Sequence, residues 1–182
     1  MRGLLKASDG INATLAAIGR IAGWLFLLNM LVICTDVVTR RWGYQLPSMG
    51  STRLQELEWH LHAALFSMWL GLTYVRDGHV RIDVLVSGLR ERTRAWVELI
   101  GCFIFALPYC AVVIYFGWDF FLRSYDQHEA SDAPTGLPLR WIIKFVLFVG
   151  LVLLAGGVIS VALRRIVYLF GPAELRPAVE KH

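Results

Sequence analysis

Charged residues are scarce in this 182-residue chain: Asp, Glu, Lys and Arg make up 18% of it, against 57% hydrophobic residues. The mean hydropathy of +0.55 is far from the balance of an ordinary soluble domain. The 3 cysteines all lie in apolar stretches, where a thiol behaves as a small hydrophobic group. We therefore expect no disulfide and no metal site, and we expect lipid to be the main solvent.

A cleavable leader and a nucleic-acid-binding surface are also missing from the sequence. Lys6 and Asp9 precede the first apolar run, and no short apolar core is followed by a small-residue cleavage site. The first hydrophobic segment is therefore expected to stay in the mature protein. The net charge is +4, but the basic residues flank apolar runs and form no stripe with interleaved aromatic residues. This charge indicates contact with anionic lipid headgroups, not with nucleic acid.

Four apolar segments are long enough, or nearly so, to cross a bilayer as helices. Crossing takes about 20 mostly apolar residues, and a helix satisfies its own backbone groups. The second segment is the weakest, because its uncharged stretch begins only at Trp59, and Pro108 is expected to bend the third. The prediction is an all-α integral membrane protein, a single membrane domain (1–182) with spans at about 11–39, 54–75, 96–122 and 140–165.

The segment between the second and third spans carries an apolar stripe. If residues 79–94 are helical, Ile82, Leu85, Val86 and Leu89 fall on one face at i, i+3, i+4 and i+7. This pattern predicts a short amphipathic connector helix in the membrane interface or against a partner. A strand is the alternative, although a lone strand would leave its edges unpaired.

The distribution of basic residues predicts the orientation. Of the 18 Lys and Arg residues, 12 fall on the side that holds both termini and the connector, and 6 on the other side. Because cytoplasmic segments are enriched in Lys and Arg, both termini and the connector are expected in the cytoplasm. Trp42, Trp59, Trp118 and Trp141 then lie at the outer ends of the spans, as in an aromatic belt.

Polar groups are rare at membrane depth. Asn29 is the most polar deep residue of the first span, and Ser67, Thr73 and Ser160 lie deep in other spans. We interpret Asn29 as the source of an interhelical hydrogen bond, with a substrate contact as the alternative. Proteins that move ions through themselves usually hold ionisable groups at this depth. The chain is therefore expected to be neither an enzyme nor an ion-binding unit by itself.

Two charged pairs repeat one spacing near the outer ends of the spans. Asp36 and Arg40, and also Asp119 and Arg123, are four residues apart, which places opposite charges on one helical face. We interpret both as interfacial ion pairs that fix the depth of a helix. The 5 histidines lie at span ends, in a loop or in the tail, and this placement argues against haem ligation within the bilayer.

The run from Leu54 to Gly101 resembles the small (Q-type, DctQ-like) permease subunit of tripartite ATP-independent periplasmic (TRAP) transporters. Glu56 and Trp59 open the second span, Gly71 is a small residue within it, and the charged block from Arg76 to Asp83 follows it. A looser match, made by Glu129, Ser131, Trp141 and Lys144, leads into the fourth span. The residues that carry the resemblance, all candidates for a partner interface or a structural role, are Glu56, Trp59, Gly71, Arg76, Asp77, His79, Arg81, Asp83, Glu129, Ser131, Trp141 and Lys144.

The resemblance implies a division of labour in a bacterial inner membrane. A large (M-type) permease subunit would carry the substrate and sodium sites and move as an elevator, and a periplasmic (P-type) binding protein would deliver an organic acid. The small subunit would be a non-catalytic, lipid-facing scaffold that holds no cofactor. His79, Arg81 and Asp83 would order the connector, and the outer loops 41–53 and 125–139 would contact the binding protein.

Two other functions stay open. A membrane anchor of a redox enzyme would show a haem absorbance band after purification. A self-sufficient small transporter would move solute in proteoliposomes that contain this chain alone.

Overall fold

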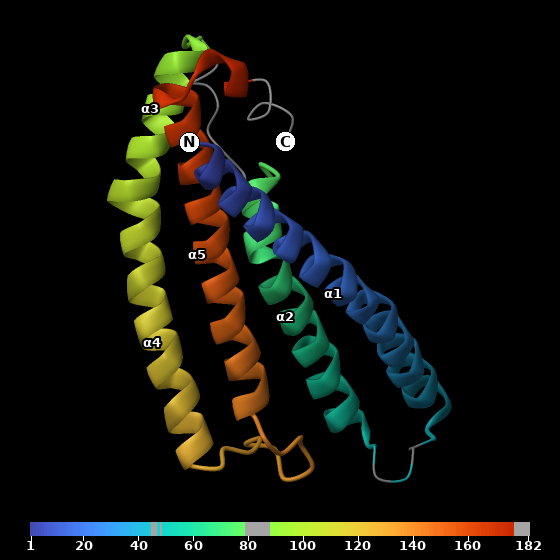
Figure 1. Ribbon diagram of the computed structural model, residues 1–182. Helices are drawn as coiled ribbons and strands as arrows, with labels where there is room; N and C mark the ends of the chain where they lie inside the picture. The colour runs from blue at the N-terminus through green and yellow to red at the C-terminus, as the bar shows by residue number, and fades with distance from the viewer. Residues whose placement is uncertain (45–46, 48, 79–87, 177–182) are drawn as a thin grey trace. The chain divides into compact units, whose positions relative to one another are not determined.

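The computed structural model describes residues 1–44, 47, 49–78 and 88–176. Figure 1 shows its helices, and no strand occurs in these ranges. The elements are α1 (Arg2–Trp42), α2 (Ser51–Val75), α3 (Glu91–Gly101), the π-helical segment η2 (Cys102–Ala106), α4 (Leu107–Asp126), α5 (Trp141–Phe170) and the 3-10 turn η3 (Ala173–Leu175). The all-α prediction is confirmed for this part of the chain.

Among the described residues, three helices have the length and composition to cross a membrane: Arg2–Trp42, Glu91–Asp126 and Trp141–Phe170. The 25-residue α2 is long enough, but Glu56, Glu58, His60 and His62 make its first half polar. A fourth span therefore stays a prediction. The long helices also extend past the predicted spans, because helical hydrogen bonds continue to satisfy the backbone beyond the hydrocarbon layer.

The predicted connector helix at 79–94 is not found as one helix. Residues 79–87, which include His79, Arg81 and Asp83, lie outside the described residues. Residues 88–90 are not helical, and Arg90 is extended, with φ −62° and ψ 144°. Residues 91–94 open α3, so the last predicted turn of the connector belongs to the long third helix.

The chain divides into two compact units. The first unit contains residues 1–17, 70–114 and 151–182, and the second contains 18–69 and 115–150. Each long helix therefore contributes residues to both units.

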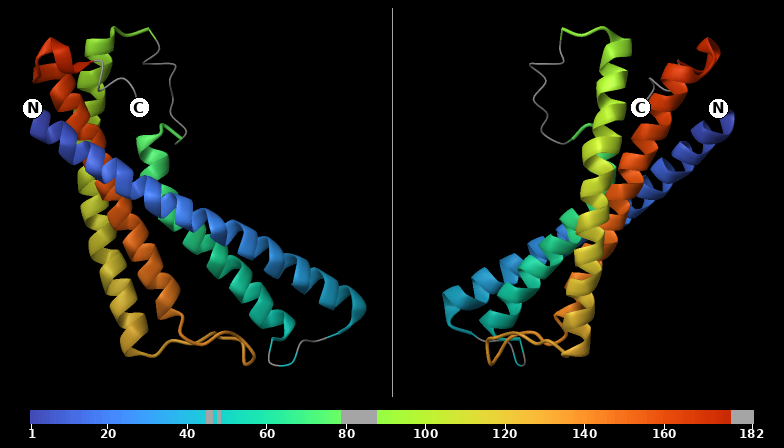
Figure 2. Two further views of the ribbon diagram at one scale, coloured as in Figure 1. Left: turned by 45° about the vertical axis from the view of Figure 1, so that its right-hand side comes forward. Right: turned by 90° about the vertical axis from the view of Figure 1, so that its left-hand side faces the viewer.

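In the first unit, an apolar core joins the third helix to the C-terminal part of α5. Its buried members are Ala95, Leu99, Cys102, Cys110, Val158, Ala162 and Leu169. The N-terminal part of α1 crosses α5 in both views of Figure 2. Small side chains at the core positions allow these helices to approach closely.

Pro108 changes the winding of the third helix. The five residues Cys102–Ala106 form a π-helical turn, after which the α-helix resumes at Leu107. Proline has no backbone N–H, and its ring clashes with the carbonyl four residues earlier, which is that of Ile104. The wider turn around Ile104 accommodates this clash, so the irregularity predicted at Pro108 occurs as a π-helical segment just before it.

In the second unit, an aromatic cluster joins the end of α4 to the start of α5. The ring of Phe121 lies 5.3 Å from that of Trp118, 6.3 Å from Trp141 and 5.1 Å from Phe145. Tyr125 meets Trp141 edge-on at 5.4 Å. These contacts hold together the two helix ends between which the loop 127–140 runs (Figure 1).

The same unit shows a different use of small residues in α1. The indole Nε1 of Trp69 donates a hydrogen bond to the carbonyl of Gly19 at 2.9 Å. A Cβ on Gly23 would meet the Trp69 ring at 3.9 Å. Gly19 and Gly23 of α1 thus both lie against the side chain of Trp69.

Candidate functional site

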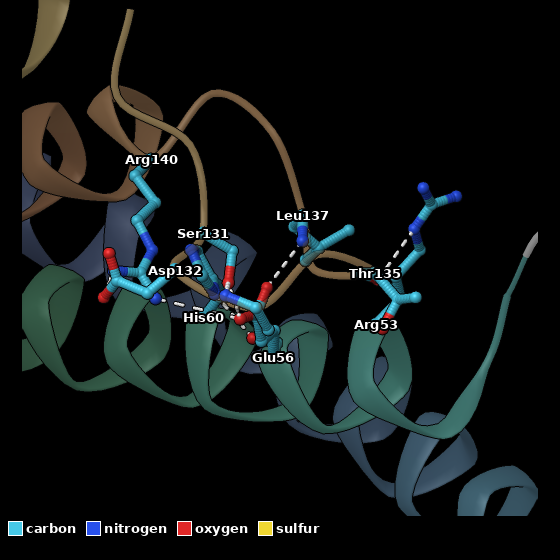
Figure 3. A network of polar contacts seen from close by, with 9 residues as sticks. Arg53, Glu56, His60, Ser131, Asp132, Thr135, Leu137 and Arg140 are labelled. Atoms are coloured by element: carbon cyan, nitrogen blue, oxygen red, sulfur yellow. Dashed lines mark hydrogen bonds and ion pairs between the residues drawn. The ribbon is translucent and has the colours of Figure 1, made fainter. Parts of the chain in front are cut away.

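Glu56, in the second turn of α2, joins this helix to the loop 127–140. The Ser131 hydroxyl donates to its Oε1, and the Leu137 amide donates to its Oε2 at 2.6 Å. An Arg140 guanidinium nitrogen lies 3.7 Å from Oε1. Figure 3 shows these groups converging on one carboxylate, which is 8% exposed. We call Glu56, Ser131, Leu137 and Arg140 the Glu56 cluster.

The loop has further hydrogen bonds of its own. The Ser131 amide donates to the Leu137 carbonyl at 3.1 Å, and the Arg140 amide donates to the Glu129 carbonyl at 3.0 Å. Arg53 of α2 donates to the Thr135 carbonyl at 3.2 Å (Figure 3). With its backbone groups paired in this way, the loop has a defined conformation beside the start of α2.

The absence of a side chain at Gly136 leaves room for the contacts of the Glu56 cluster. A Cβ at this position would lie 2.2 Å from the Ser131 hydroxyl oxygen and 2.8 Å from Glu56 Oε2. No side chain fits there without displacing the carboxylate or the serine. The sequence analysis missed Gly136, although the Pro-Thr-Gly-Leu-Pro run that contains it is a turn signal.

A second ion pair connects the loop to α5. Lys144 donates a hydrogen bond to the Glu129 carboxylate, and its ammonium nitrogen lies 3.9 Å from the centroid of the Phe120 ring. The hydrogen bond from Lys144 holds the pKa of Glu129 below its ordinary value of 4.5. Glu129 is therefore a stable anion at neutral pH, and it anchors the start of the loop.

The end of α1 and the start of α2 share another carboxylate. Asp36, 1% exposed, pairs with Arg40 and accepts a hydrogen bond from the Ser51 hydroxyl at 3.0 Å. The ion pair predicted at this spacing is confirmed within α1 and is half buried, and the hydrogen bond from Ser51 connects its carboxylate to α2. The Asp119–Arg123 pair is also present, at 2.8 Å, and is well exposed.

Of the sequence-predicted residues, the structure brings Glu56 and Ser131 together and pairs Glu129 with Lys144. Trp59 is half exposed on α2. Trp141 belongs instead to the aromatic cluster of the second unit described above. These placements give the residues of the looser match definite structural roles.

The other described residues that carry the family resemblance lie in the first unit. Gly71 lies against α5, where an added Cβ would be 2.3 Å from the Leu153 carbonyl. Arg76 and Asp77 end α2: the Gly78 amide bonds the Thr73 carbonyl at 2.9 Å, and Asp77 has φ 54°. This is a Schellman cap with aspartate in the left-handed position usually taken by glycine.

A buried polar network in the first unit was not predicted. The Ser8 and Ser160 hydroxyls are 2.7 Å apart, and Ser160 also donates to Asn12 Oδ1 at 2.6 Å. Arg164 donates to the Ser8 hydroxyl at 3.0 Å and pairs with Asp9 at 2.6 Å. No periodic signal in the sequence marks these contacts, because they join residues about 150 positions apart.

Asn29 is buried, and its Oδ1 has no hydrogen-bond partner within the described ranges. The interhelical hydrogen bond predicted for Asn29 is therefore not made through this oxygen in the described part of the chain, and for the side-chain amide nitrogen it stays a prediction.

The family comparison adds an independent finding. A family model described as "Tripartite ATP-independent periplasmic transporters, DctQ component" matches residues 29–168. No curated protein and no solved structure matches the chain.

Proposed function

The chain belongs to the DctQ family, the small membrane subunits of TRAP transporters, and from this premise we propose that it is the scaffold of such a complex. In this proposal, a large permease subunit performs sodium-coupled uptake of an organic acid that a periplasmic binding protein delivers. The complex lies in the bacterial inner membrane, and both termini of this chain are cytoplasmic. The chain holds the large subunit in place and takes no part in binding the solute or the ion.

The charge distribution along the helices is the observation that carries this proposal. No charged residue occurs between Arg20 and Asp36, between Glu98 and Asp119, or between Lys144 and Arg164. These stretches form the central part of each of the three candidate spans. A chain with such spans has few groups with which to bind a charged solute or a cation.

Exposed apolar side chains support a partner at these helices. Ile21, Trp24 and Leu31 on α1, and Phe105 and Tyr115 along the third helix, are 66% to 73% exposed. Apolar surface of this kind is stable only against lipid or another membrane protein. A scaffold needs such surface over several turns of helix.

The test is reconstitution with and without the large subunit. The tagged chain, coexpressed with a TRAP large permease from the same genome, is purified in mild detergent and placed in proteoliposomes under a sodium gradient. We expect copurification, and uptake of organic acid only when both chains and the binding protein are present. Transport by this chain alone, or a haem absorbance band in the purified protein, would contradict the scaffold function.

We also propose that the loop 127–140 and the start of α2 contact the binding protein. The Glu56 cluster gives this loop a fixed conformation, and the Asp132 side chain is 99% exposed on it. With Asp132→Cys, we expect a bifunctional maleimide to cross-link the chain to the binding protein. Gly10→Cys, at an exposed position on the predicted cytoplasmic side, is the matched control. Equal cross-linking of the two variants would argue against this contact.

The connector remains a proposal drawn from the sequence. We propose that Arg81 and Asp83 order the segment between the second and third helices. Arg81→Gln and Asp83→Asn should then reduce transport while the amount of complex in the membrane stays normal. Wild-type uptake in both variants would leave these residues as ordinary membrane-flanking charges.

A further inference from the structure

The second unit contains a cavity of about 430 Å³, lined by α2, the end of α4, the loop and the start of α5. Ligand pockets in proteins fall in the range of about 300–1,000 Å³. Most of the lining is apolar, with Trp59 and Phe66 from α2, Phe120 from α4 and Leu147 from α5. The cavity is thus large enough for part of a ligand with a substantial hydrocarbon body.

The charged lining residues gather at one end of the cavity, apart from most of the apolar ones. On α5, Lys144 and the preceding Arg140 line the cavity near the helix start, and Leu147 lines it one turn further on. On α2, the lining runs from Trp59 to Ser67, which is roughly 12 Å along a helix. The cavity therefore has cations at the predicted outer end of the membrane and hydrocarbon below them.

The charges at the polar end favour an anionic group. Three ionised side chains line the cavity: Arg140, Lys144 and Glu129. Two are cations, so the lining itself carries one net positive charge, while Glu56 and Asp132, which pair with Arg140, lie outside the lining. The Arg140 Nε is buried and has no hydrogen-bond partner within the described ranges. Arg140 and Lys144 are 21% and 15% exposed, so a ligand oxygen could still approach them from the cavity.

We propose that this cavity is a specific phospholipid site, with the phosphate against Arg140 and Lys144 and one acyl chain between α2 and α5. Arg and Lys donors form strong charge-assisted hydrogen bonds with phosphate oxygens. Basic pockets between membrane helices bind lipid headgroups at the cytoplasmic face of membranes, and we propose that the same chemistry operates here at the predicted outer face. A small organic anion would satisfy the cations but would leave the apolar part of the cavity empty.

The lipid has a structural role in this site. It fills the space between α2 and α5 beside the Glu56 cluster, and its phosphate neutralises the net charge of the lining. Both effects hold the loop 127–140 in its conformation. The site does not depend on which solute the complex transports.

Native mass spectrometry of the full chain in detergent tests the proposal. The probes are phosphatidylglycerol, phosphatidylethanolamine and diacylglycerol with identical acyl chains, and inorganic phosphate. We expect the two phospholipids to bind about tenfold more tightly than diacylglycerol, which lacks the phosphate. Inorganic phosphate is expected not to displace them, because it gains nothing from the apolar part.

Two variants address the two parts of the site. Ala63→Leu fills the cavity from its α2 side and leaves every ion pair intact, and Lys144→Gln removes a phosphate ligand. Both should reduce phospholipid binding by about tenfold or more. The matched controls are Ala111→Leu, at an exposed position on α4, and Arg123→Gln, an exposed cation of the same unit.

Three outcomes would overturn the proposal. Equal binding of diacylglycerol and phospholipid would exclude a phosphate site, and displacement by inorganic phosphate would indicate a simple anion site. If Ala63→Leu leaves lipid binding unchanged but prevents copurification of the large permease, the occupant of the cavity is a protein side chain. Because Ala63→Leu keeps Lys144 and Glu129 paired, its result is independent of whether Lys144→Gln disturbs the loop.

Discussion

The two units of this protein use polar residues in opposite ways. In the first unit, the polar network around Ser8, Ser160 and Arg164 joins helix to helix inside close-packed surfaces. In the second unit, the Glu56 cluster joins a helix to a loop, next to a cavity. The first arrangement fixes the helices, while the second shapes a surface that can meet other molecules.

Gly71→Leu should have the largest effect, because it breaks the packing of the first unit. Even its Cβ would lie 2.3 Å from the Leu153 carbonyl, so α2 must move away from α5. Overpacking of this kind typically costs about 1–3 kcal/mol, and backbone displacement adds to it. We expect a clear fall in the melting temperature measured by circular dichroism in detergent.

Gly156→Ala is the matched control for this change, because its Cβ would meet only Ile11 at an ordinary distance of 3.8 Å. If Gly71→Leu and Gly156→Ala unfold at the same temperature, the close approach at Gly71 does not stabilise the first unit.

Glu56→Gln should affect the second unit alone. The amide presents a donor to a site that offers only donors, and it loses the charge that faces Arg140. The expected loss is about 1–3 kcal/mol of local stability. Hydrogen exchange should accelerate in the loop 127–140 and stay unchanged in residues 95–110.

Glu58→Gln makes the same chemical change two residues further along α2 and touches none of the contacts of the Glu56 cluster. Slow exchange of the loop in Glu56→Gln would show that the loop holds its conformation without the carboxylate.

The pH dependence of stability should differ between the wild type and a variant that lacks the Glu129 carboxylate of the second unit. Because the pKa of Glu129 is lower in the folded protein than its ordinary value of 4.5, this carboxylate stabilises the fold fully above that pH. The contribution falls as the pH drops below 4.5 and is lost once the pH passes the folded pKa. Between pH 6 and pH 3, Glu129→Gln should show a smaller decrease in melting temperature than the wild type. Parallel curves for the two proteins would exclude a stabilising Glu129–Lys144 pair.

Arg123→Gln should have the smallest effect. Arg123 and Asp119 are 73% and 47% exposed, and such surface pairs contribute about 0–1 kcal/mol. The melting temperature should stay close to that of the wild type. A large decrease would mean that this pair acts as a buried one does, which would remove the contrast with the Glu56 cluster.

The sequence was sufficient for the helices and for the local pairs. Apolar runs indicated the long helices, and the i, i+4 spacing identified the Asp36–Arg40 and Asp119–Arg123 pairs. Pro108 was expected to bend the third helix, and the structure has a π-helical segment just before it. All of these depend on residues close together in the chain, where helical periodicity fixes which side chains meet.

The contacts between distant segments could not be predicted in the same way. Glu56 and Ser131 were singled out through the family resemblance, but nothing in their spacing indicates that they share a hydrogen bond. Ser8, Asn12 and Gly136 carry no periodic signal at all, because their roles depend on which helix or loop lies opposite. For Asn29, the hydrogen-bonding capacity of the side chain did not imply a partner for its Oδ1 among the described residues.

The separation of Glu56 from its loop partners has a consequence for biosynthesis. Ser131 is 75 residues further along the chain, and ribosomes add roughly 5–20 residues per second. The donors to the Glu56 carboxylate are therefore synthesised several seconds after the glutamate itself. During this time it must stay hydrated or protonated at the edge of the translocation machinery. The second unit is thus completed late in membrane insertion, when the end of α4, the loop 127–140 and the start of α5 have been synthesised.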